Sequence, residues 1–268
     1  MPQTETLLCT VRECRLPLLR DGSRFLCGRG HSFDAARSGY VNLLQPQDKR
    51  SKKPGDTAAA VAGRRRLHDR GVTAPLLAAV AELLGARAED SILDAGCGEG
   101  FYMGSIARAT GCAGHGVDIA TAAVDAAARR YPECQWVAAN ADRFVPWADG
   151  AFSAVMSITA RMNPAEFRRV LRADGRLLVA VPAPDDLIEL RGQGRERTQR
   201  TIEEFAPHFA LAEQRRASTT AELDAAAVDD VLHSIYRPMR GETAPADAER
   251  AMPLTFSLDL LLFRPVIS

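Results

Sequence analysis

The stretch that decides the fold is Ser91-Ile-Leu-Asp94-Ala-Gly96-Cys-Gly98-Glu-Gly100, a short apolar run that leads into a glycine-rich turn. Glycine at every second position lets the backbone pass close to a bound ligand. The spacing is G-x-G-x-G and differs from the G-x-G-x-x-G of dinucleotide-binding loops. Because Asp94 and Glu99 would repel a pyrophosphate, the loop favours a cofactor that carries positive charge.

S-adenosylmethionine is such a cofactor, since it has a sulfonium and an α-amino group. Asp118 ends the next expected strand, where an acidic side chain is placed to accept both ribose hydroxyls. Asn140 and Asp142 follow the third expected strand and are assigned to the adenine edge. The predicted cofactor-binding residues are therefore Asp94, Gly96, Gly98, Glu99, Gly100, Asp118, Asn140 and Asp142.

Short apolar strands alternate with helical segments from residue 91 onward, which predicts a parallel sheet covered on both faces. The pattern is less regular beyond residue 182, where we expect a helix over 224–234 and a late strand over 254–263. The expected strands are 91–94, 113–118, 135–139, 152–158 and 176–181, and the expected helices are 101–110, 121–130 and 164–171. Upstream, helices are expected from Asp56 or Thr57 to Arg70 and from Pro75 to Leu84.

The composition is that of a globular protein with one large domain, or with one ordinary and one small domain. The chain has 268 residues, of which 46% are hydrophobic and 25% charged. It contains no apolar run of the roughly 18 residues that a transmembrane helix needs. No apolar signal core is visible near the N-terminus, so we expect a cytoplasmic protein without a membrane partner.

Charge is unevenly distributed although the net charge is zero. Residues 1–75 contain 14 Lys and Arg against 7 Asp and Glu, a net charge of +7, and the rest of the chain carries −7. A basic first quarter suggests an end that faces a polyanion. An Arg-rich surface without a partner is the alternative explanation.

The first 31 residues contain a metal-binding pattern. Cys9-x4-Cys14 is followed by Cys27-x3-His31, and two such ligand pairs can close a tetrahedron around Zn²⁺. Four protein ligands leave no open position, so the zinc site is predicted to be structural. The alternative is a set of unrelated buried cysteines.

These patterns predict three regions: a zinc-binding domain over 1–40, a basic linker and helix over 41–75, and a methyltransferase domain over 76–268. The expected fold class is α/β, a class I (Rossmann-like) S-adenosylmethionine-dependent methyltransferase with a small N-terminal zinc-binding domain.

The chain resembles the bacterial 23S rRNA guanine-N1 methyltransferases of the RlmA/RrmA type along nearly its whole length. The resemblance is carried by the zinc pattern and the glycine loop together with several short motifs. These motifs are His31-Ser-Phe33-Asp34, Gly39-Tyr-Val-Asn-Leu-Leu44, Lys49-Arg50-Ser51, Pro54-Gly55-Asp56, Arg64-Arg65-Arg66 and Glu166-Phe-Arg-Arg-Val-Leu171.

The resemblance implies methylation of N1 of a guanine in the hairpin of helix 35 of 23S rRNA, a structural zinc, and a homodimer with a cleft for RNA. One branch of the family modifies guanine 745. Another modifies guanine 748 and includes macrolide-resistance proteins. The stretch from Gln47 to Asp56 is more like the first branch, whereas Asn163-Pro164 and residues 254–265 are more like the second. Guanine 745 is preferred on this basis.

Two departures from the family pattern stand out. The first ligand pair is usually C-x2-C, and here two extra residues separate Cys9 from Cys14. After the fourth strand the family tends to have an aromatic-Ala-Pro stretch near the target base, and here Thr159-Ala160-Arg161 stands instead. An aromatic ring can stack on an unstacked base and threonine cannot. This departure therefore bears on which nucleotide is methylated and on whether the protein is active.

Reaching N1 of a paired guanine requires the base to leave its stack. A base that accepts the N1 proton, or a group that stabilises charge on O6, is expected to assist. Asp142 and Arg161 are the candidates, with cofactor binding and an unpartnered surface position as their alternatives. The residues expected to contact RNA phosphates are Lys49, Arg50, Lys52, Lys53, Arg64, Arg65 and Arg66. The isolated His68, His115, His208 and His233 are expected to be structural or at the surface.

Two other functions fit the same motifs. The first is a small-molecule methyltransferase with a zinc-stabilised extension, against which the basic first quarter argues. The second is an RNA-binding member of the family that has lost catalysis, against which the intact glycine loop and Asp118 argue.

Overall fold

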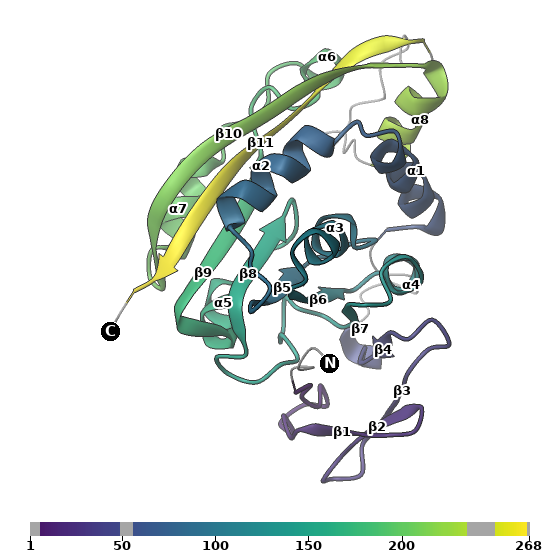
Figure 1. The fold of residues 1–268 in the computed structure, drawn as a ribbon, viewed down its shortest axis with the longest axis vertical. Coiled ribbons are helices and arrows are strands. Elements are labelled where there is room, and N and C mark those ends of the chain that lie inside the picture. Colours follow the sequence, from purple (N-terminus) through teal and green to yellow (C-terminus); the bar gives the residue numbers. More distant parts are fainter. Residues whose placement is uncertain (1–5, 49–55, 235–249, 267–268) are drawn as a thin grey trace.

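The structure, a computed structural model, describes residues 6–48, 56–234 and 250–266. Its centre is an eight-stranded sheet with the strand order β10-β11-β9-β8-β5-β6-β7-β4 (Figure 1). The strands are β4 (Val41–Asn42), β5 (Ser91–Ala95), β6 (Ala113–Asp118), β7 (Gln135–Ala138), β8 (Phe152–Ile158), β9 (Leu171–Pro182), β10 (Phe209–Leu223) and β11 (Met252–Pro265). The six strands from β9 to β4 are parallel, and β11 and β10 are antiparallel additions at one side.

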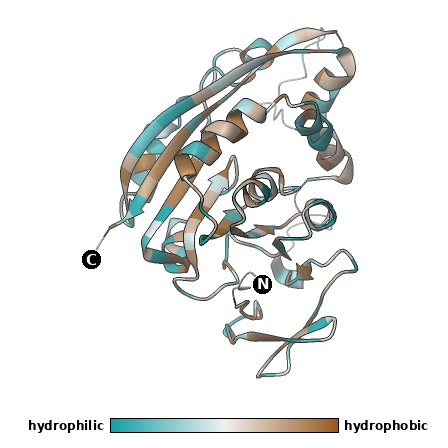
Figure 2. Cartoon of the chain, in the orientation of Figure 1, coloured by the Kyte–Doolittle hydropathy of each residue, from teal (hydrophilic) through white to brown (hydrophobic). Residues whose placement is uncertain are grey.

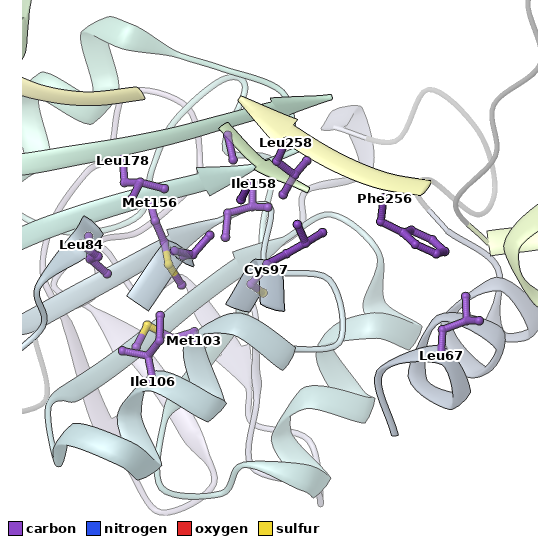
Figure 3. Packing of buried hydrophobic residues seen from close by; sticks show 14 of the residues in the cluster. Leu67, Leu84, Cys97, Met103, Ile106, Met156, Ile158, Leu178, Phe256 and Leu258 are labelled. Carbon is purple, nitrogen blue, oxygen red and sulfur yellow. The ribbon is translucent and has the colours of Figure 1, made fainter. Parts of the chain in front are cut away.

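Helices cover the two faces of this sheet. One face packs against α2 (Ala74–Leu84), α3 (Phe101–Thr110) and α4 (Thr121–Arg130), and the other against α5 (Pro164–Val170) and α7 (Thr198–Phe205). Successive strand residues point to opposite faces, so Ile92 belongs to the first buried cluster and Leu93 to the second. Figure 3 shows part of the first cluster, including Met103 and Ile106 of α3 and Met156 of β8. The expected α/β class is confirmed.

The α1 helix (Ala58–Asp69) begins at Thr57, whose side chain accepts a hydrogen bond from the backbone N–H of Ala60 at 3.2 Å. This is an N-cap, and it identifies Thr57 rather than Asp56 as the helix start. The α1 helix packs beside α8 (Ala225–Ser234), the helix expected over 224–234. None of the described helices has the length and apolar character that a bilayer span requires.

The long antiparallel pair of β10 and β11 closes one side of the sheet and arches over α2 in Figure 1. The late strand expected over 254–263 is confirmed as part of β11, but β10 was not expected. Most of β10 is exposed at the sheet edge and hydrophilic, whereas β11 is hydrophobic along much of its length (Figure 2). The buried residues of β10 are Phe209, Ala217 and Leu223, which are too widely spaced to give the apolar alternation by which strands are recognised in sequence.

The N-terminal module has its own small antiparallel sheet, β1 (Leu18–Asp21), β2 (Arg24–Cys27) and β3 (Ser32–Asp34). It is not a separate body, because β4 of the Gly39–Leu44 motif pairs in parallel with β7 of the main sheet. Leu7 forms a bridge with Trp147, and both belong to the buried cluster that includes Cys9 and Phe33. The segment expected as a linker over 41–75 therefore begins inside the main sheet.

Candidate active site and metal centre

A cavity of about 850 Å³ lies at the carboxyl ends of the parallel strands. The chain runs from β5 to β6 and β7 on one side and then crosses to β8 and β9 on the other. The crevice at such a reversal of strand order is where open α/β sheets bind ligands. Asp94, Gly96, Gly98, Glu99 and Asp118 all line this cavity, so the structure brings together most of the predicted cofactor residues.

Asp94 is the clearest sign that the cavity binds a ligand. It is only 2% exposed, and its Oδ1 has no hydrogen-bond partner among the described residues. Burial, with further contributions from the charges of Asp118 and Glu99, raises the pKa of Asp94 well above its usual range. A buried acceptor of this kind normally has a partner, and the amino group of S-adenosylmethionine fits this carboxylate.

Asp118 is held by two backbone groups of the loops around it. The N–H of Gly98 donates to Oδ2 at 3.0 Å and the N–H of Ala120 donates to Oδ1 at 2.8 Å. Burial raises the pKa of Asp118 despite these two bonds. Each oxygen keeps a second lone pair, so the carboxylate is fixed in place and can still accept two hydroxyl groups.

The glycines of the loop have different functions. Gly96 has a φ of +87°, and a Cβ at this position would lie 2.3 Å from the Cβ of Ala160. Gly100 also has a positive φ, but a Cβ there would meet the ring of Trp136 at 2.6 Å. Gly100 does not line the cavity. It allows α3 to pack on β7, so its predicted contact with the cofactor stays unsupported.

Glu99 faces α1 through an ion-paired network. The Nε2 of His68 lies 3.0 Å from the Glu99 carboxylate and Arg64 lies 3.7 Å from it. Burial opposes ionisation of Glu99, but the hydrogen bond and charge of His68 together with the charge of Arg64 lower its pKa. Arg64 also pairs with Asp56.

These contacts fix the place of His68 and of the predicted RNA-binding arginines. The His68 ring stacks on Phe101 with 3.8 Å between the ring centroids, and its Nδ1 lies 2.6 Å from the hydroxyl oxygen of Thr73. His68 is therefore a buried structural residue.

Arg64 lines the cofactor cavity, which favours a structural role there over an RNA contact. Arg65 lies 3.6 Å from Asp69, and Arg66 pairs with Asp230. Lys49, Arg50, Lys52 and Lys53 lie outside the described residues.

Asp142 and Arg161 meet at the cavity. Their charged groups are 3.4 Å apart, and both residues line it while staying open to solvent, with 46% and 77% of their side chains exposed. Asn163 donates through Nδ2 to the carbonyl oxygens of Asp142 at 3.0 Å and Ala141 at 3.3 Å. This bond pair ties the loop after β7 to the loop after β8. Asn140 does not line the cavity, so its predicted adenine contact stays unsupported.

Thr159 adopts a left-handed backbone conformation with a φ of +50°. This region is rarely populated by a β-branched residue. Its backbone N–H donates to the carbonyl oxygen of Ala180 at 2.9 Å, which fixes the turn. The turn places Ala160 against Gly96 and leaves Arg161 at the mouth of the cavity.

The four predicted metal ligands converge in the N-terminal module. The ligand atoms of Cys9, Cys14, Cys27 and His31 all lie within 4.8 Å of one another. The Nδ1 of His31 is 3.4 Å from the Sγ of Cys9 and 3.3 Å from that of Cys27, and Cys14 and Cys27 are 3.7 Å apart. A tetrahedral site with Zn–S bonds of ~2.3 Å has edges of about 3.8 Å, so the cluster fits Zn²⁺. The two extra residues between Cys9 and Cys14 do not open it.

Sequence reasoning missed several residues around the cavity. Arg64 and His68 of α1 and Tyr102 of α3 line it, as does Asp186, which pairs with Arg191. Arg64 belongs to the Arg64-Arg65-Arg66 motif but was assigned to RNA, and His68, Tyr102 and Asp186 belong to no motif. All four meet the glycine loop only through the packing of helices and loops onto the sheet. Their residue types gave no signal that a single sequence could show.

The fold, the cofactor cavity and the cysteine cluster define a class I S-adenosylmethionine-dependent methyltransferase with a structural zinc site. Residues 8–52 match the family described as RlmA, N-terminal, a zinc ribbon, and residues 92–179 match the family described as methyltransferase domain. The 23S rRNA (guanine(748)-N(1))-methyltransferase of Streptomyces fradiae is 37% identical over 230 residues, 82% of this chain and 81% of that protein. The chain belongs to the family of 23S rRNA guanine-N1 methyltransferases.

Other comparisons agree with this family and fold. A Bacillus subtilis protein that is provisionally named as a 23S rRNA (guanine-N1-) methyltransferase is 35% identical over 183 residues, 63% of this chain and 62% of that protein. A chain from the complex of the Haloferax volcanii Trm112 methyltransferase activator with a methyltransferase aligns with a TM-score of 0.54 and 17% identity. That alignment covers 79% of this chain and 96% of the other, and at this identity it shows the fold alone.

Proposed function

We propose that this protein transfers a methyl group from S-adenosylmethionine to N1 of a guanine in the helix 35 hairpin of 23S rRNA. The observation that carries the proposal is the likeness to the Streptomyces fradiae enzyme. It extends over 82% of this chain, more than the methyltransferase match over residues 92–179 alone accounts for. The basic N-terminal part, which a small-molecule enzyme would not need, supports the same substrate class.

Guanine 748 is the position we favour. The motif around Gln47–Asp56 resembles the guanine 745 branch, and the sequence alone therefore favours guanine 745. The relative whose name specifies a position acts on guanine 748 and is 37% identical over most of both chains. Asn163, which resembles the same branch, ties together the two loops that hold Asp142 and Arg161.

The residues of the cavity suit S-adenosylmethionine, which supplies an activated methyl group when bound. We assign the ribose hydroxyls to Asp118 and the amino group to Asp94, whose Oδ1 has no partner among the described residues. Gly96 and Gly98 give the ligand room to approach the backbone. The zinc ligands are assigned to Cys9, Cys14, Cys27 and His31.

Asp142 and Arg161 are the residues we assign to the target base. N1 of guanine carries a proton, and its neighbour O6 is a hydrogen-bond acceptor. The Asp142 carboxylate would take the N1 proton as the N1–methyl bond forms, and the Arg161 guanidinium would stabilise the negative charge that reaches O6. Their separation of 3.4 Å at the cavity suits two adjacent atoms on one edge of a base.

The remaining RNA contacts and the assembly are proposals from the resemblance. Lys49, Arg50, Lys52, Lys53, Arg65 and Arg66 are assigned to RNA phosphates. The homodimer is assigned on the same ground, and light scattering of the purified protein would measure it.

The test is methyl transfer to short transcripts of the helix 35 hairpin, with a labelled methyl donor. One transcript has adenine in place of guanine 748 and another has adenine in place of guanine 745. We expect label in the natural hairpin and in the 745 variant, and none in the 748 variant. If the 745 variant alone remained unlabelled, the methylated position would be guanine 745 instead. A protein that binds the cofactor and labels no RNA would refute the proposed function and favour a small-molecule substrate or a binding role.

A further inference from the structure

The two sides of the cavity differ in charge. On one side lie the acidic residues Asp94 in β5, Asp118 at the end of β6 and Asp142 in the loop after β7. On the other side, β8, β9 and β11 contribute the uncharged Ile158, Pro182, Phe256 and Leu258. The segment that follows β9 adds four guanidinium groups to the lining: Arg191, Arg195, Arg197 and Arg200.

This basic segment joins α6 (Ile188–Arg191) to α7 (Thr198–Phe205) and is anchored beside β11. The backbone N–H of Leu187 donates to the carbonyl oxygen of Thr255 at 2.7 Å, and that of Gly194 donates to Pro184 at 2.6 Å. The hydroxyl of Thr198 lies 3.3 Å from a carboxylate oxygen of the buried Asp259. The segment is therefore fixed at the uncharged side of the cavity.

Three of the four arginines are exposed and have no ion pair with any residue that the structure describes: Arg195, Arg197 and Arg200. Arg191 differs, because it pairs with Asp186. The acid within the segment, Glu196, accepts hydrogen bonds from the backbone N–H groups of Thr198 and Gln199 at the start of α7. Glu204 also lines the cavity but forms no ion pair with these described arginines.

We propose that Arg195, Arg197 and Arg200 bind the phosphates on either side of the target guanine and hold the unstacked nucleotide in the cavity. This inference rests on the proposed function and adds a second RNA-binding surface, distant in sequence from residues 49–66. A base that has left its stack brings its flanking phosphates to the mouth of the pocket. Arginine is suited to them, because its planar group donates two parallel hydrogen bonds to phosphate oxygens.

The experiment compares the wild-type protein with the triple variant Arg195→Gln/Arg197→Gln/Arg200→Gln. The matched control is Arg87→Gln/Arg172→Gln, since both of these arginines are exposed and lie at the opposite, amino-terminal ends of β5 and β9. The dissociation constant of a labelled helix 35 hairpin is measured by fluorescence anisotropy at several salt concentrations. Cofactor binding is measured separately by calorimetry.

We expect the triple variant to bind the hairpin at least tenfold more weakly, with the control unchanged. Its plot of log affinity against log salt should become shallower by about 2, since each lost phosphate contact removes roughly 0.7–0.9 of slope. The triple lysine variant should recover part of the affinity. Cofactor affinity should stay within twofold of the wild-type value.

Unchanged hairpin affinity and salt slope in the triple variant would overturn the inference. So would a loss of cofactor affinity as large as the loss of RNA affinity, because the arginines would then belong to the cofactor site. Failure of the proposed function gives a different result, in which the wild-type protein itself neither retains nor methylates the hairpin.

Discussion

The backbone N–H of Leu43 donates a hydrogen bond to the carbonyl oxygen of Ala138 at 2.8 Å. This bond continues the parallel pairing of β4 with β7 and joins the zinc module to the edge of the cofactor-binding sheet. The N–H of Ala139, the next residue, donates to the carbonyl oxygen of Asp118 at 3.0 Å. A short chain of backbone bonds therefore connects the zinc module to the cofactor site.

Removal of one zinc ligand should destabilise the whole chain. Cys9, Cys14 and Cys27 belong to the same buried cluster as Trp147 and Val137, so the module and the sheet share a core. We expect Cys27→Ser to lose its equivalent of zinc and to unfold in a single transition at a lower temperature. Metal analysis and calorimetry measure both effects. Cys112→Ser is the control, because Cys112 is a buried cysteine that is not one of the four predicted zinc ligands, and this variant should keep its zinc. Two separate transitions in Cys27→Ser would show that the module is independent.

Gly96→Ala should abolish cofactor binding. The new Cβ would lie 2.3 Å from the Cβ of Ala160, and the left-handed φ adds about 1–2 kcal/mol of strain. The double variant Gly96→Ala/Ala160→Gly removes the clash and keeps the strain, so its cofactor affinity should recover in part. Calorimetric titration with S-adenosylmethionine measures both. Full recovery in the double variant would mean that the backbone conformation has no influence.

Asp118→Asn should weaken cofactor binding far more than it weakens the fold. Hydrogen bonds to a charged group are worth about 1.5–3 kcal/mol, so the loss of this charge should raise the dissociation constant roughly 10- to 100-fold. Because burial raises the pKa of Asp118, loss of its charge is favourable in the free protein. The amide nitrogen of Asn cannot accept from Gly98 or Ala120, so one backbone hydrogen bond is lost. These two effects oppose each other, and we expect the melting temperature to change by only a few degrees. Asp149→Asn, in the turn before β8, is the control. Unchanged affinity in Asp118→Asn would remove this residue from the site.

Asp142→Asn should slow methyl transfer about 100-fold or more, the usual contribution of a general base. Arg161→Gln should slow it as well, and Arg161→Lys should retain more of the rate. The deficit of Asp142→Asn should shrink at high pH, where N1 of guanine loses its proton without help. Single-turnover rates across a pH series measure these effects with saturating cofactor. A weaker cofactor affinity in Asp142→Asn with an unchanged rate would assign Asp142 to the adenine instead.

His115 should make the protein less stable as the pH falls below neutrality. It is buried beside Trp147 and Phe152, and burial lowers its pKa from 6.5 to about 4. The unfolded chain binds this proton between pH 6.5 and 4 and the folded chain does not, so stability is lost as the pH falls through that window. Between pH 7 and pH 5 we expect the free energy of unfolding to fall by about 2 kcal/mol more in the wild-type protein than in His115→Leu. Urea unfolding at both pH values, with zinc in excess, measures it. An equal pH dependence in wild type and variant would contradict the assignment.

Local patterns in the sequence predict the central part of the fold. The glycine loop, the helix after it and the strand that ends at Asp118 follow from residues that are neighbours in sequence. The pairing of β4 with β7 could not be predicted in this way, because a two-residue strand has no periodicity and its partner is distant in sequence. The strand β10 has few large apolar residues on its partly buried face, so its sequence shows no apolar alternation.

The same limit applies to the site. The convergence of the three cysteines and His31 could be predicted because their spacing is itself the signal, and the structure brings the four residues together. Glu99 was expected to face the cofactor because an acid in the glycine loop suits a positively charged ligand. Its partners His68 and Arg64 come from α1, and only helix packing brings them to the loop. The meeting of Asp142 with Arg161 likewise depends on two loops that Asn163 ties together.

The most direct test of the central claim is to identify the methylated nucleoside. The wild-type protein is incubated with isotopically labelled S-adenosylmethionine and unmodified 23S rRNA, and the RNA is digested and analysed by mass spectrometry. We predict label in 1-methylguanosine alone, within the helix 35 fragment, and much less of it with Asp118→Asn. Label in any other nucleoside, or no label from a protein that binds the cofactor, would contradict the assignment.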